Sequence, residues 1–251
     1  MKKLCFALAL VLLVLVFASC GGKDASVEKQ KTEVLYVYNW GEYISDGSEE
    51  SFDTNAEFEA YCREVLGRNV KVNYSTFSSN EDMYAKVSSG AIAYDVLIPS
   101  DYTIERMVNE QLIRPLDLSK IPNYRFISDD FKGENVYYEC GTEETYSIPY
   151  FYGMIGIIYN TDIVSEEDAE ARSWDLMWNE NYRGDILQFN NSRDASGTAL
   201  YKLGYSVNNA TEEQWAEALE LLKQQKELVQ SYVMDEIFNK MKSGSAAISA
   251  Y

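Results

Sequence analysis

The run Glu33-Val34-Leu35-Tyr36-Val37-Tyr38-Asn39 predicts the first strand of a parallel sheet, because it is β-rich and almost continuously apolar. It is followed by Trp40-Gly41-Glu42-Tyr43, which places aromatic rings beside a carboxylate. A second short apolar run, Asp95 to Pro99, is followed by Ser100-Asp101-Tyr102. If the two runs are parallel strands of one sheet, their carboxyl ends share an edge, where open α/β sheets bind ligands. We therefore expect a binding site at this edge.

Helix and strand patterns alternate around these two runs. Asp53 or Thr54 is a candidate N-cap of one helix, and Ser78 answered by Glu81 is a capping pattern for another. The expected elements are a helix from Ser51 to Leu66, a strand from Asn69 to Thr76, a helix from Ser78 to Gly90 and a helix from Tyr102 to Ile113. The order β-α-β-α-β predicts a parallel sheet joined by right-handed crossovers.

A second α/β lobe is expected after the polar stretch from Leu116 to Thr145, so that the first lobe covers residues 33–145 and the second 146–251. Its expected strands are Tyr146–Tyr150, Gly153–Asn160, Asp185–Phe189 and Ser245–Tyr251, and its expected helices are Asp194–Leu203, Thr211–Gln230 and Asp235–Ser243. Since an apolar strand with no turn or cap after it is an unusual end for a domain, the sequence predicts a C-terminally truncated lobe.

The N-terminus has the features of an export signal. Lys2 and Lys3 precede a short apolar run and the small residues before Cys20, which predicts a signal peptide over residues 1–19 and a flexible linker over 20–32. The stretch that ends in Cys20 resembles the bacterial lipobox, so we expect lipidation of Cys20 and an anchor on the outer face of the membrane, or a periplasmic location. An ordinary signal with a chance cysteine is the alternative.

Composition excludes several classes of function. The net charge of −18 disfavours nucleic acid and anionic ligands and favours cations. The chain has no histidine, which removes the usual general base and the usual zinc ligand. We therefore expect no catalytic residue, metal or cofactor. Cys62 shares a helical face with apolar residues and is expected to be a buried thiol; a disulfide with Cys140 is disfavoured.

The residues after the two strand runs suit an organic cation. An aromatic face attracts an ammonium group by about 0.5–2 kcal/mol, and a carboxylate at contact adds roughly 4 kcal/mol before desolvation. Trp40, Glu42 and Tyr43 on one loop and Ser100 and Tyr102 on the other supply this chemistry. The competing interpretation is structural, with the aromatic residues packed in the core and Ser100 or Asp101 capping the next helix.

A third polar stretch, Asn190-Asn191-Ser192-Arg193-Asp194, follows the strand expected at Asp185–Phe189 and opens a helix. It is placed to face the first-lobe loops across a crevice, and an Asx-type helix cap with an exposed arginine is the alternative. Acidic pairs such as Glu143 and Glu144 are interpreted as solvated surface.

Four motifs in a shared order resemble the spermidine/putrescine-binding proteins of bacterial polyamine ABC importers. They are the run from Tyr38 to Tyr43, the segment Tyr74–Lys86, the run Tyr94–Ser100, and Tyr146–Tyr150 with the glycine-rich apolar strand after it. The similarity continues through Trp174, Asn191–Asp194 and Ala199–Ser206. It implies a two-lobed α/β fold of the type II periplasmic-binding-protein class, with parallel-rich sheets and a monomeric receptor that closes on a polyamine and docks on a permease.

Carried over by position, the resemblance implies that Trp40 and Tyr43 contact the methylene chain and that Glu42 and Asp194 contact amines, with Ser100 and Tyr102 donating or accepting hydrogen bonds. Asn191 stands where some members of the family have a carboxylate. Because an amide cannot neutralise charge, the number of amines recognised, and so the choice between spermidine and putrescine, stays open.

Two other functions compete with a polyamine receptor. One keeps the two-lobed receptor but assigns it another solute, such as an amino acid, thiamine or a ferric ion. The other is an exported hydrolase, which would need two facing carboxylates at roughly 5–9.5 Å, and the sequence nominates no such pair.

Overall fold

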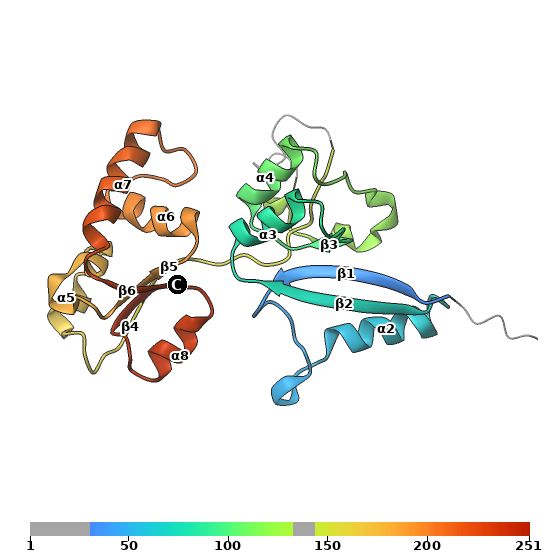
Figure 1. Cartoon of the computed structure of the whole chain (residues 1–251), viewed down its shortest axis with the longest axis horizontal. Helices are drawn as coiled ribbons and strands as arrows, with labels where there is room; N and C mark the ends of the chain where they lie inside the picture. The colour runs from blue at the N-terminus through green and yellow to red at the C-terminus, as the bar shows by residue number, and fades with distance from the viewer. Residues whose placement is uncertain (1–30, 133–143) are drawn as a thin grey trace, which may run out of the picture.

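The computed structural model describes residues 31–132 and 144–251, which form two α/β lobes lying side by side (Figure 1). The first lobe contains a three-stranded sheet in the order β2-β1-β3, with β1 (Glu33–Trp40), β2 (Val70–Phe77) and β3 (Val96–Leu97). Both pairings are parallel, and the register places Tyr38 opposite Leu97. The carboxyl ends of β1 and β3 therefore share one edge, which confirms the strand arrangement expected from the sequence.

Three helices cover this sheet. They are α2 (Thr54–Glu64) on one face, and α3 (Asn80–Ser88) and α4 (Asp101–Asn109) on the other (Figure 1). The Asp53 carboxylate caps α2 as expected, by accepting a hydrogen bond from the Ala56 backbone N–H. Ser79, and not Ser78, caps α3. Of the two candidates for the N-cap of α4, Ser100 or Asp101, the structure has Ser100 at this position, and its side chain makes no capping bond.

The second lobe contains a four-stranded sheet in the order β4-β7-β5-β6. Its strands are β4 (Ile157–Tyr159), β5 (Ile186–Phe189), β6 (Val229–Val233) and β7 (Ile248–Ala250), and its helices are α5 (Glu166–Glu170), α6 (Ser192–Lys202), α7 (Glu212–Gln225) and α8 (Glu236–Lys242). Strands β6 and β7 run parallel to β5, whereas β4 is antiparallel to β7. The carboxyl ends of β5 and β6 lead into the loops before α6 and α8.

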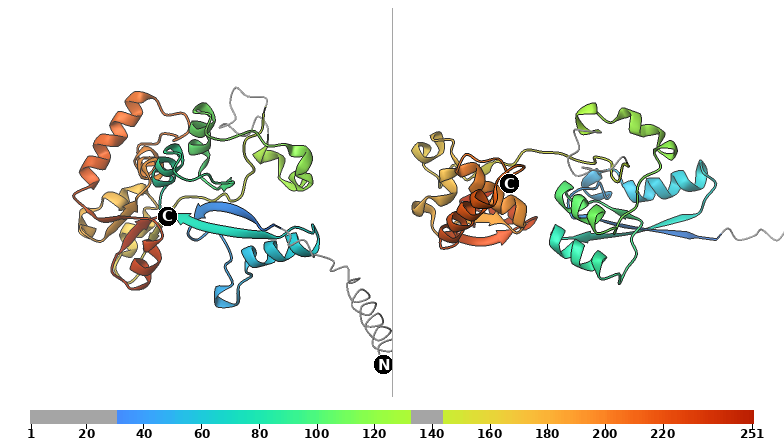
Figure 2. Two further views of the ribbon diagram at one scale, coloured as in Figure 1. Left: turned by 45° about the vertical axis from the view of Figure 1, so that its right-hand side comes forward. Right: turned by 90° about the horizontal axis from the view of Figure 1, so that it is seen from above.

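Short 3₁₀ helices fill the connections of both lobes. They are η1 (Ser48–Glu50), η2 (Leu118–Lys120), η3 (Pro122–Phe126), η4 (Asp129–Phe131), η7 (Trp174–Trp178) and η8 (Glu180–Tyr182). An extended connection, residues 144–156, runs between the lobes (Figure 2).

Two expectations for the second lobe were wrong. The helix expected to run to Gln230 ends at Gln225, and the strand β6 follows it, because Val229 continues the apolar spacing of the helix but pairs with Ile186 of β5 instead. The segment Tyr146–Tyr150 forms no ladder and belongs to the extended connection between the lobes. In both cases the outcome depends on whether the segment pairs with a strand that is distant in the sequence, and a local pattern does not report such pairing.

A buried hydrogen-bond network fixes β5 against the helices behind it. The Gln188 side-chain amide donates to Thr198 Oγ1 (3.0 Å) and to Gln225 Oε1 (2.8 Å), and the Gln225 amide donates to the Met177 carbonyl (3.0 Å). All three polar side chains are fully buried. Because their donors are satisfied, the network rigidifies the strand that carries the loop of residues 190–194.

Several sequence expectations fall on or beside residues that the structure leaves undescribed. Cys62 is buried and free, as expected, whereas Cys140 lies outside the described residues. The signal peptide, Cys20 and most of the linker also lie outside them, and the boundary at residues 145 and 146 stays a prediction. Within residues 31–132 and 144–251, no helix combines the length and apolarity needed to cross a bilayer.

Candidate functional site

The loop after β1 is held by the buried side chain of Asn39. Its Oδ1 accepts from the Trp40 backbone N–H (2.8 Å), and its Nδ2 donates to the Tyr43 carbonyl (3.3 Å). The Tyr150 hydroxyl, on the extended connection, donates to the same carbonyl (2.6 Å). These contacts fold residues 40–43 into a tight loop at the carboxyl edge of the sheet, where Glu42 is presented.

Aromatic rings line this loop. The Trp40 ring lies 4.6 Å from the Phe77 ring and 6.3 Å from the Tyr43 ring, and Phe151 lies 5.3 Å from Tyr43. Trp40 is half-buried and Tyr43 is exposed, so the rings are accessible to a ligand rather than sealed in the core. Such a surface binds apolar carbon chains and attracts cations to its faces.

The loop after β3 is organised by Asn80, a residue that sequence reasoning missed. Its Nδ2 donates to Ser100 Oγ (3.0 Å) and to the Tyr102 hydroxyl (2.8 Å), and its Oδ1 accepts from the Ser100 backbone N–H (3.0 Å). Burial, with the charge of Glu81 next, raises the pKa of Tyr102 to about 12, so its hydroxyl stays protonated near neutral pH. The two residues expected here, Ser100 and Tyr102, are thus brought together.

The loop after β5 places Asn191 and Asp194 against the first lobe. Asn191 is almost fully buried and caps α6, because its Oδ1 accepts from the backbone N–H groups of Arg193 (3.0 Å) and Asp194 (3.2 Å). The same oxygen accepts from the Tyr102 hydroxyl across the lobes (3.2 Å). The helix cap considered for this stretch is therefore present, and it coexists with a contact to the opposite lobe.

Asp194 is a partly buried carboxylate with a strongly perturbed pKa. Burial raises the pKa of Asp194 to about 6; the nearby charge of Arg193 lowers it, and the charges of Asp101 and Glu81 raise it further. These last two carboxylates belong to the first lobe. A carboxylate that is desolvated and surrounded by other acids is an electrostatic site for a cation.

A second acidic residue of this lobe, Asp235, was missed by sequence reasoning. Its Oδ2 lies over the backbone of Gly41, only 2.6 Å from where a Cβ would stand. It occupies the N-cap position of α8 but makes no capping bond, so its carboxylate is not used by the helix. Burial, followed by the charge of Glu42, raises the pKa of Asp235. Glu42 of the first lobe therefore lies within electrostatic range of Asp235 of the second.

The Tyr43 hydroxyl lies within electrostatic range of both Asp194 and Asp235. Burial raises the pKa of the Tyr43 hydroxyl, and the charges of Asp194 and of Asp235 raise it further. The aromatic wall at Trp40 and Tyr43 therefore lies within electrostatic range of carboxylates on both sides. This arrangement suits a ligand with positive charges separated by apolar carbon.

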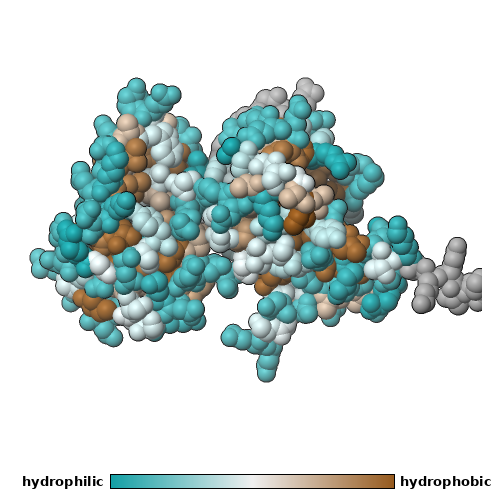
Figure 3. Space-filling model, viewed as in Figure 1, coloured by the Kyte–Doolittle hydropathy of each residue, from teal (hydrophilic) through white to brown (hydrophobic). Residues whose placement is uncertain are grey.

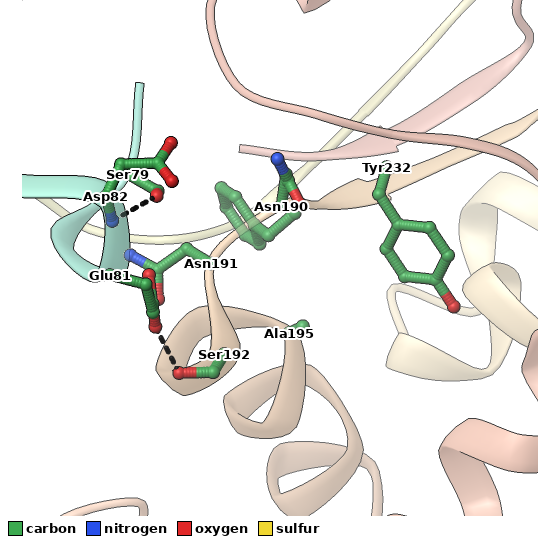
Figure 4. Close-up of a pocket in the computed structure, with 9 residues that line it drawn as sticks. Ser79, Glu81, Asp82, Asn190, Asn191, Ser192, Ala195 and Tyr232 are labelled. Atoms are coloured by element: carbon green, nitrogen blue, oxygen red, sulfur yellow. Dashed lines mark hydrogen bonds between the residues drawn. The ribbon is translucent and has the colours of Figure 1, made fainter. Parts of the chain in front are cut away.

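Two cavities open where the lobes meet. One, of ≈ 430 Å³, is lined by residues that include Glu81, Asp82, Asn191, Ser192 and Tyr232 (Figure 4). The other, of ≈ 410 Å³, is lined by residues that include Tyr38, Gly41, Phe77, Asp82 and Asp235. Asp82 lines both cavities, so they lie next to each other on either side of this residue. No group of acids and cysteines suited to hold a metal ion occurs within the described ranges.

The molecular surface around this region is polar. Figure 3 shows hydrophilic side chains over most of one face of both lobes, with apolar patches among them. The acidic excess of the chain and the carboxylates of the interlobe region have the same sign, so the surface field attracts the cation that the site suits.

Comparison with known proteins gives a consistent result. A family model described as bacterial extracellular solute-binding protein matches residues 92–251. The spermidine/putrescine-binding periplasmic protein of Escherichia coli (strain K12) is 32% identical over 211 residues, which cover 84% of this chain and 56% of that protein.

Two solved structures have similar folds. The spermidine/putrescine ABC transporter substrate-binding protein of Streptococcus pneumoniae, solved with calcium and HEPES, is 35% identical with a TM-score of 0.61, and the match covers 87% of this chain and 62% of that one. A lipoprotein of Treponema pallidum is 31% identical with a TM-score of 0.69, covering 87% of this chain and 63% of that one. The chain therefore spans less than two thirds of the length of these relatives.

Proposed function

The chain belongs to the bacterial extracellular solute-binding protein family, and from this premise we propose that it binds a linear polyamine, spermidine or putrescine, between its lobes and delivers it to an ABC permease. The observation that supports the proposal is that the Asp235 carboxylate lies against Gly41, between the aromatic Trp40 and Glu42 in the sequence, and that Asp194 and Asp235 are both within electrostatic range of Tyr43. Carboxylates from both lobes and an aromatic wall between them match a flexible chain of methylenes that ends in ammonium groups.

Each part of the ligand has a partner in this proposal. The rings of Trp40 and Tyr43 pack against the methylenes. An ammonium group over a ring face is attracted by about 0.5–2 kcal/mol. Glu42 and Asp235 bind one amine from opposite lobes, and Asp194 binds the other. Ser100 and Tyr102 line the path between them. Asp235 supplies the carboxylate that Asn191 does not provide, so two amines still find acidic partners.

The relatives support the transport role and the location. Those from Escherichia coli and Streptococcus pneumoniae carry spermidine and putrescine in their names, and the one from Treponema pallidum is a lipoprotein. We propose that this protein is likewise exported as a monomer and anchored through lipid on Cys20. In this arrangement the lobes face the medium and present the filled receptor to permease subunits in the membrane.

Calorimetry on the full-length protein tests the ligand. Putrescine and spermidine are expected to bind with micromolar or tighter affinity, whereas 1,4-butanediol, which has the same carbon chain as putrescine and no charge, is expected to give no heat. Binding of neither polyamine would refute the proposal, and a subsequent screen of amino acids, thiamine and ferric ion would then test the alternative solutes.

A pair of charge-matched variants tests the site itself. Glu42→Gln is expected to weaken polyamine binding at least tenfold, which corresponds to about 1.4 kcal/mol. Glu57→Gln removes one charge from an exposed position in the first turn of α2 and is expected to leave the affinity nearly unchanged. Equal affinities of the two variants would place the ligand away from the loop after β1.

A further inference from the structure

The side-chain amide of Asn80 has a fixed orientation. The Ser100 backbone N–H can only donate, and it points at Asn80 Oδ1 (3.0 Å), which identifies this atom as the oxygen. The amide nitrogen therefore faces Ser100 Oγ (3.0 Å) and the Tyr102 hydroxyl (2.8 Å), and its two hydrogens are both used. Asn80 is only 1% exposed, so no water competes for these contacts.

The amide of Asn191 is fixed in the same way from the other lobe. Its Oδ1 accepts from the backbone N–H groups of Arg193 and Asp194, which can only donate. The Tyr102 hydroxyl lies between the two amides, accepting from Asn80 and standing 3.2 Å from Asn191 Oδ1. Its proton is therefore directed to Asn191, because the side facing Asn80 is already occupied by a donor.

A second contact joins the same two elements nearby. The Ser192 hydroxyl, in the first turn of α6, donates to Glu81 on α3 (2.5 Å), as Figure 4 shows. The Arg193 guanidinium also stands 5.4 Å from the centre of the Tyr102 ring. Three consecutive residues of the second lobe thus contact the start of α3 and the start of α4 in the first.

We propose that Asn80, Tyr102 and Asn191 form a hydrogen-bond clasp that holds the two lobes closed, with Asn80 as the positioning residue that directs the Tyr102 hydroxyl across the cleft. The direction of every bond in the clasp is set by backbone donors at its two ends. Asn191 acts in it as an acceptor whose oxygen is already engaged by three donors, which leaves that oxygen poorly placed to serve as a ligand for an amine.

The clasp explains the amide at position 191. A carboxylate there would also accept from Tyr102 and cap α6, but it would add a negative charge beside Asp194 and Glu81, which already repel each other. With asparagine, the lobes are joined at this point without further repulsion between acids. The substitution of an amide for a carboxylate therefore favours closure over an additional contact with the ligand.

Small-angle X-ray scattering of the ligand-free, full-length protein tests the clasp independently of the polyamine proposal. Tyr102→Phe removes only the hydroxyl and is expected to raise the open-to-closed ratio about fivefold, the effect of losing one hydrogen bond of about 1 kcal/mol, and so to increase the radius of gyration. Tyr84→Phe is the matched control, because it removes a tyrosine hydroxyl that hydrogen-bonds Glu110 on the outer surface of the first lobe.

A double-mutant cycle separates positioning from general structural support. Asn80→Ala alone is expected to open the lobes to a similar degree, but the combination with Tyr102→Phe should be no more open than Tyr102→Phe alone. An unchanged radius of gyration for Tyr102→Phe, or effects of the two substitutions that simply add, would overturn the proposal. If Asn80→Ala does not fold, the comparison of Tyr102→Phe with Tyr84→Phe still decides whether the clasp exists.

Discussion

Replacing Asp194 by asparagine is expected to stabilise the empty protein and to weaken ligand binding. The pKa of this carboxyl is raised from its usual value of 3.8 to about 6, mainly by burial. The folded state therefore binds the proton more tightly than the unfolded state, so the ionised carboxylate opposes folding above pH 6. A shift of about two units corresponds to a cost of about 3 kcal/mol at pH 7, and this cost disappears as the pH falls from about 6 to below 3.8.

The expected sizes of the two effects follow from the same carboxylate. Asp194→Asn removes the cost of the buried charge, so the melting temperature at pH 7.5 should rise by about 5 °C or more, and by much less at pH 4. A carboxylate and an ammonium at contact attract by roughly 4 kcal/mol, and a neutral amide retains a hydrogen bond of about 1 kcal/mol. Polyamine affinity at pH 7.5 should therefore fall by about 100-fold.

Calorimetric unfolding and titration calorimetry measure both effects on one sample. Affinity of the natural protein is expected to fall as the pH drops through 6, because the neutral carboxyl no longer attracts an amine, and the variant should lack this step. Asp162→Asn, on an exposed turn after β4, is the control for the loss of one charge from the same lobe. A variant that is less stable than the natural protein, or that binds polyamine equally well, would refute the reasoning.

Three further substitutions test other parts of the structure. Gly41→Ala places a Cβ 2.6 Å from Asp235 Oδ2 and must displace that flexible carboxylate, so affinity should fall about tenfold with little change in melting temperature; a large loss of stability would contradict the geometry. Gln225→Leu leaves a buried amide hydrogen and a buried carbonyl without partners, and chemical denaturation should show a loss of about 2–3 kcal/mol. Asn191→Asp adds a charge beside a carboxyl whose pKa is already about 6 and should raise that pKa further, which shifts the pH at which polyamine affinity declines upward; an unchanged midpoint would exclude this coupling.

The first lobe was predictable because its strands have strong local signals. The apolar run before Asn39 and the short run before Ser100 both form strands, and the helices between them leave a parallel arrangement as the natural solution. The placement of the loops after β1 and β3 at one edge of the sheet then follows from topology alone. The same rule failed to identify Asp235, because the first two residues of the strand before it, β6, were interpreted as the end of a helix and the others were assigned to no element.

That error shows why sequence reasoning missed part of the candidate site. Had Val229–Val233 been recognised as a strand parallel to β5, its carboxyl end would have pointed to Asp235, as it did for the loop at Asn191. Asn80 was hidden for a different reason. It looks like one polar residue among several at the start of α3, and only the fold shows that it is buried and turned toward the loop after β3.

The arrangement of acids predicts that a bound cation favours closure of this cleft. The charge of Glu42 raises the pKa of Asp235, and the charges of Asp101 and Glu81 raise the pKa of Asp194, so closing the lobes brings carboxylates within range of one another. Hydrogen bonds from Tyr102 and Ser192 oppose this repulsion, and each contributes on the order of 1 kcal/mol. A ligand with ammonium groups removes the repulsion and adds attraction at once, whereas a neutral chain of equal length fills the same space and leaves the acids opposed. For the proposed polyamine ligand, we therefore expect selectivity for charged amines to arise as much from the cost of closing the empty site as from any single contact with the ligand.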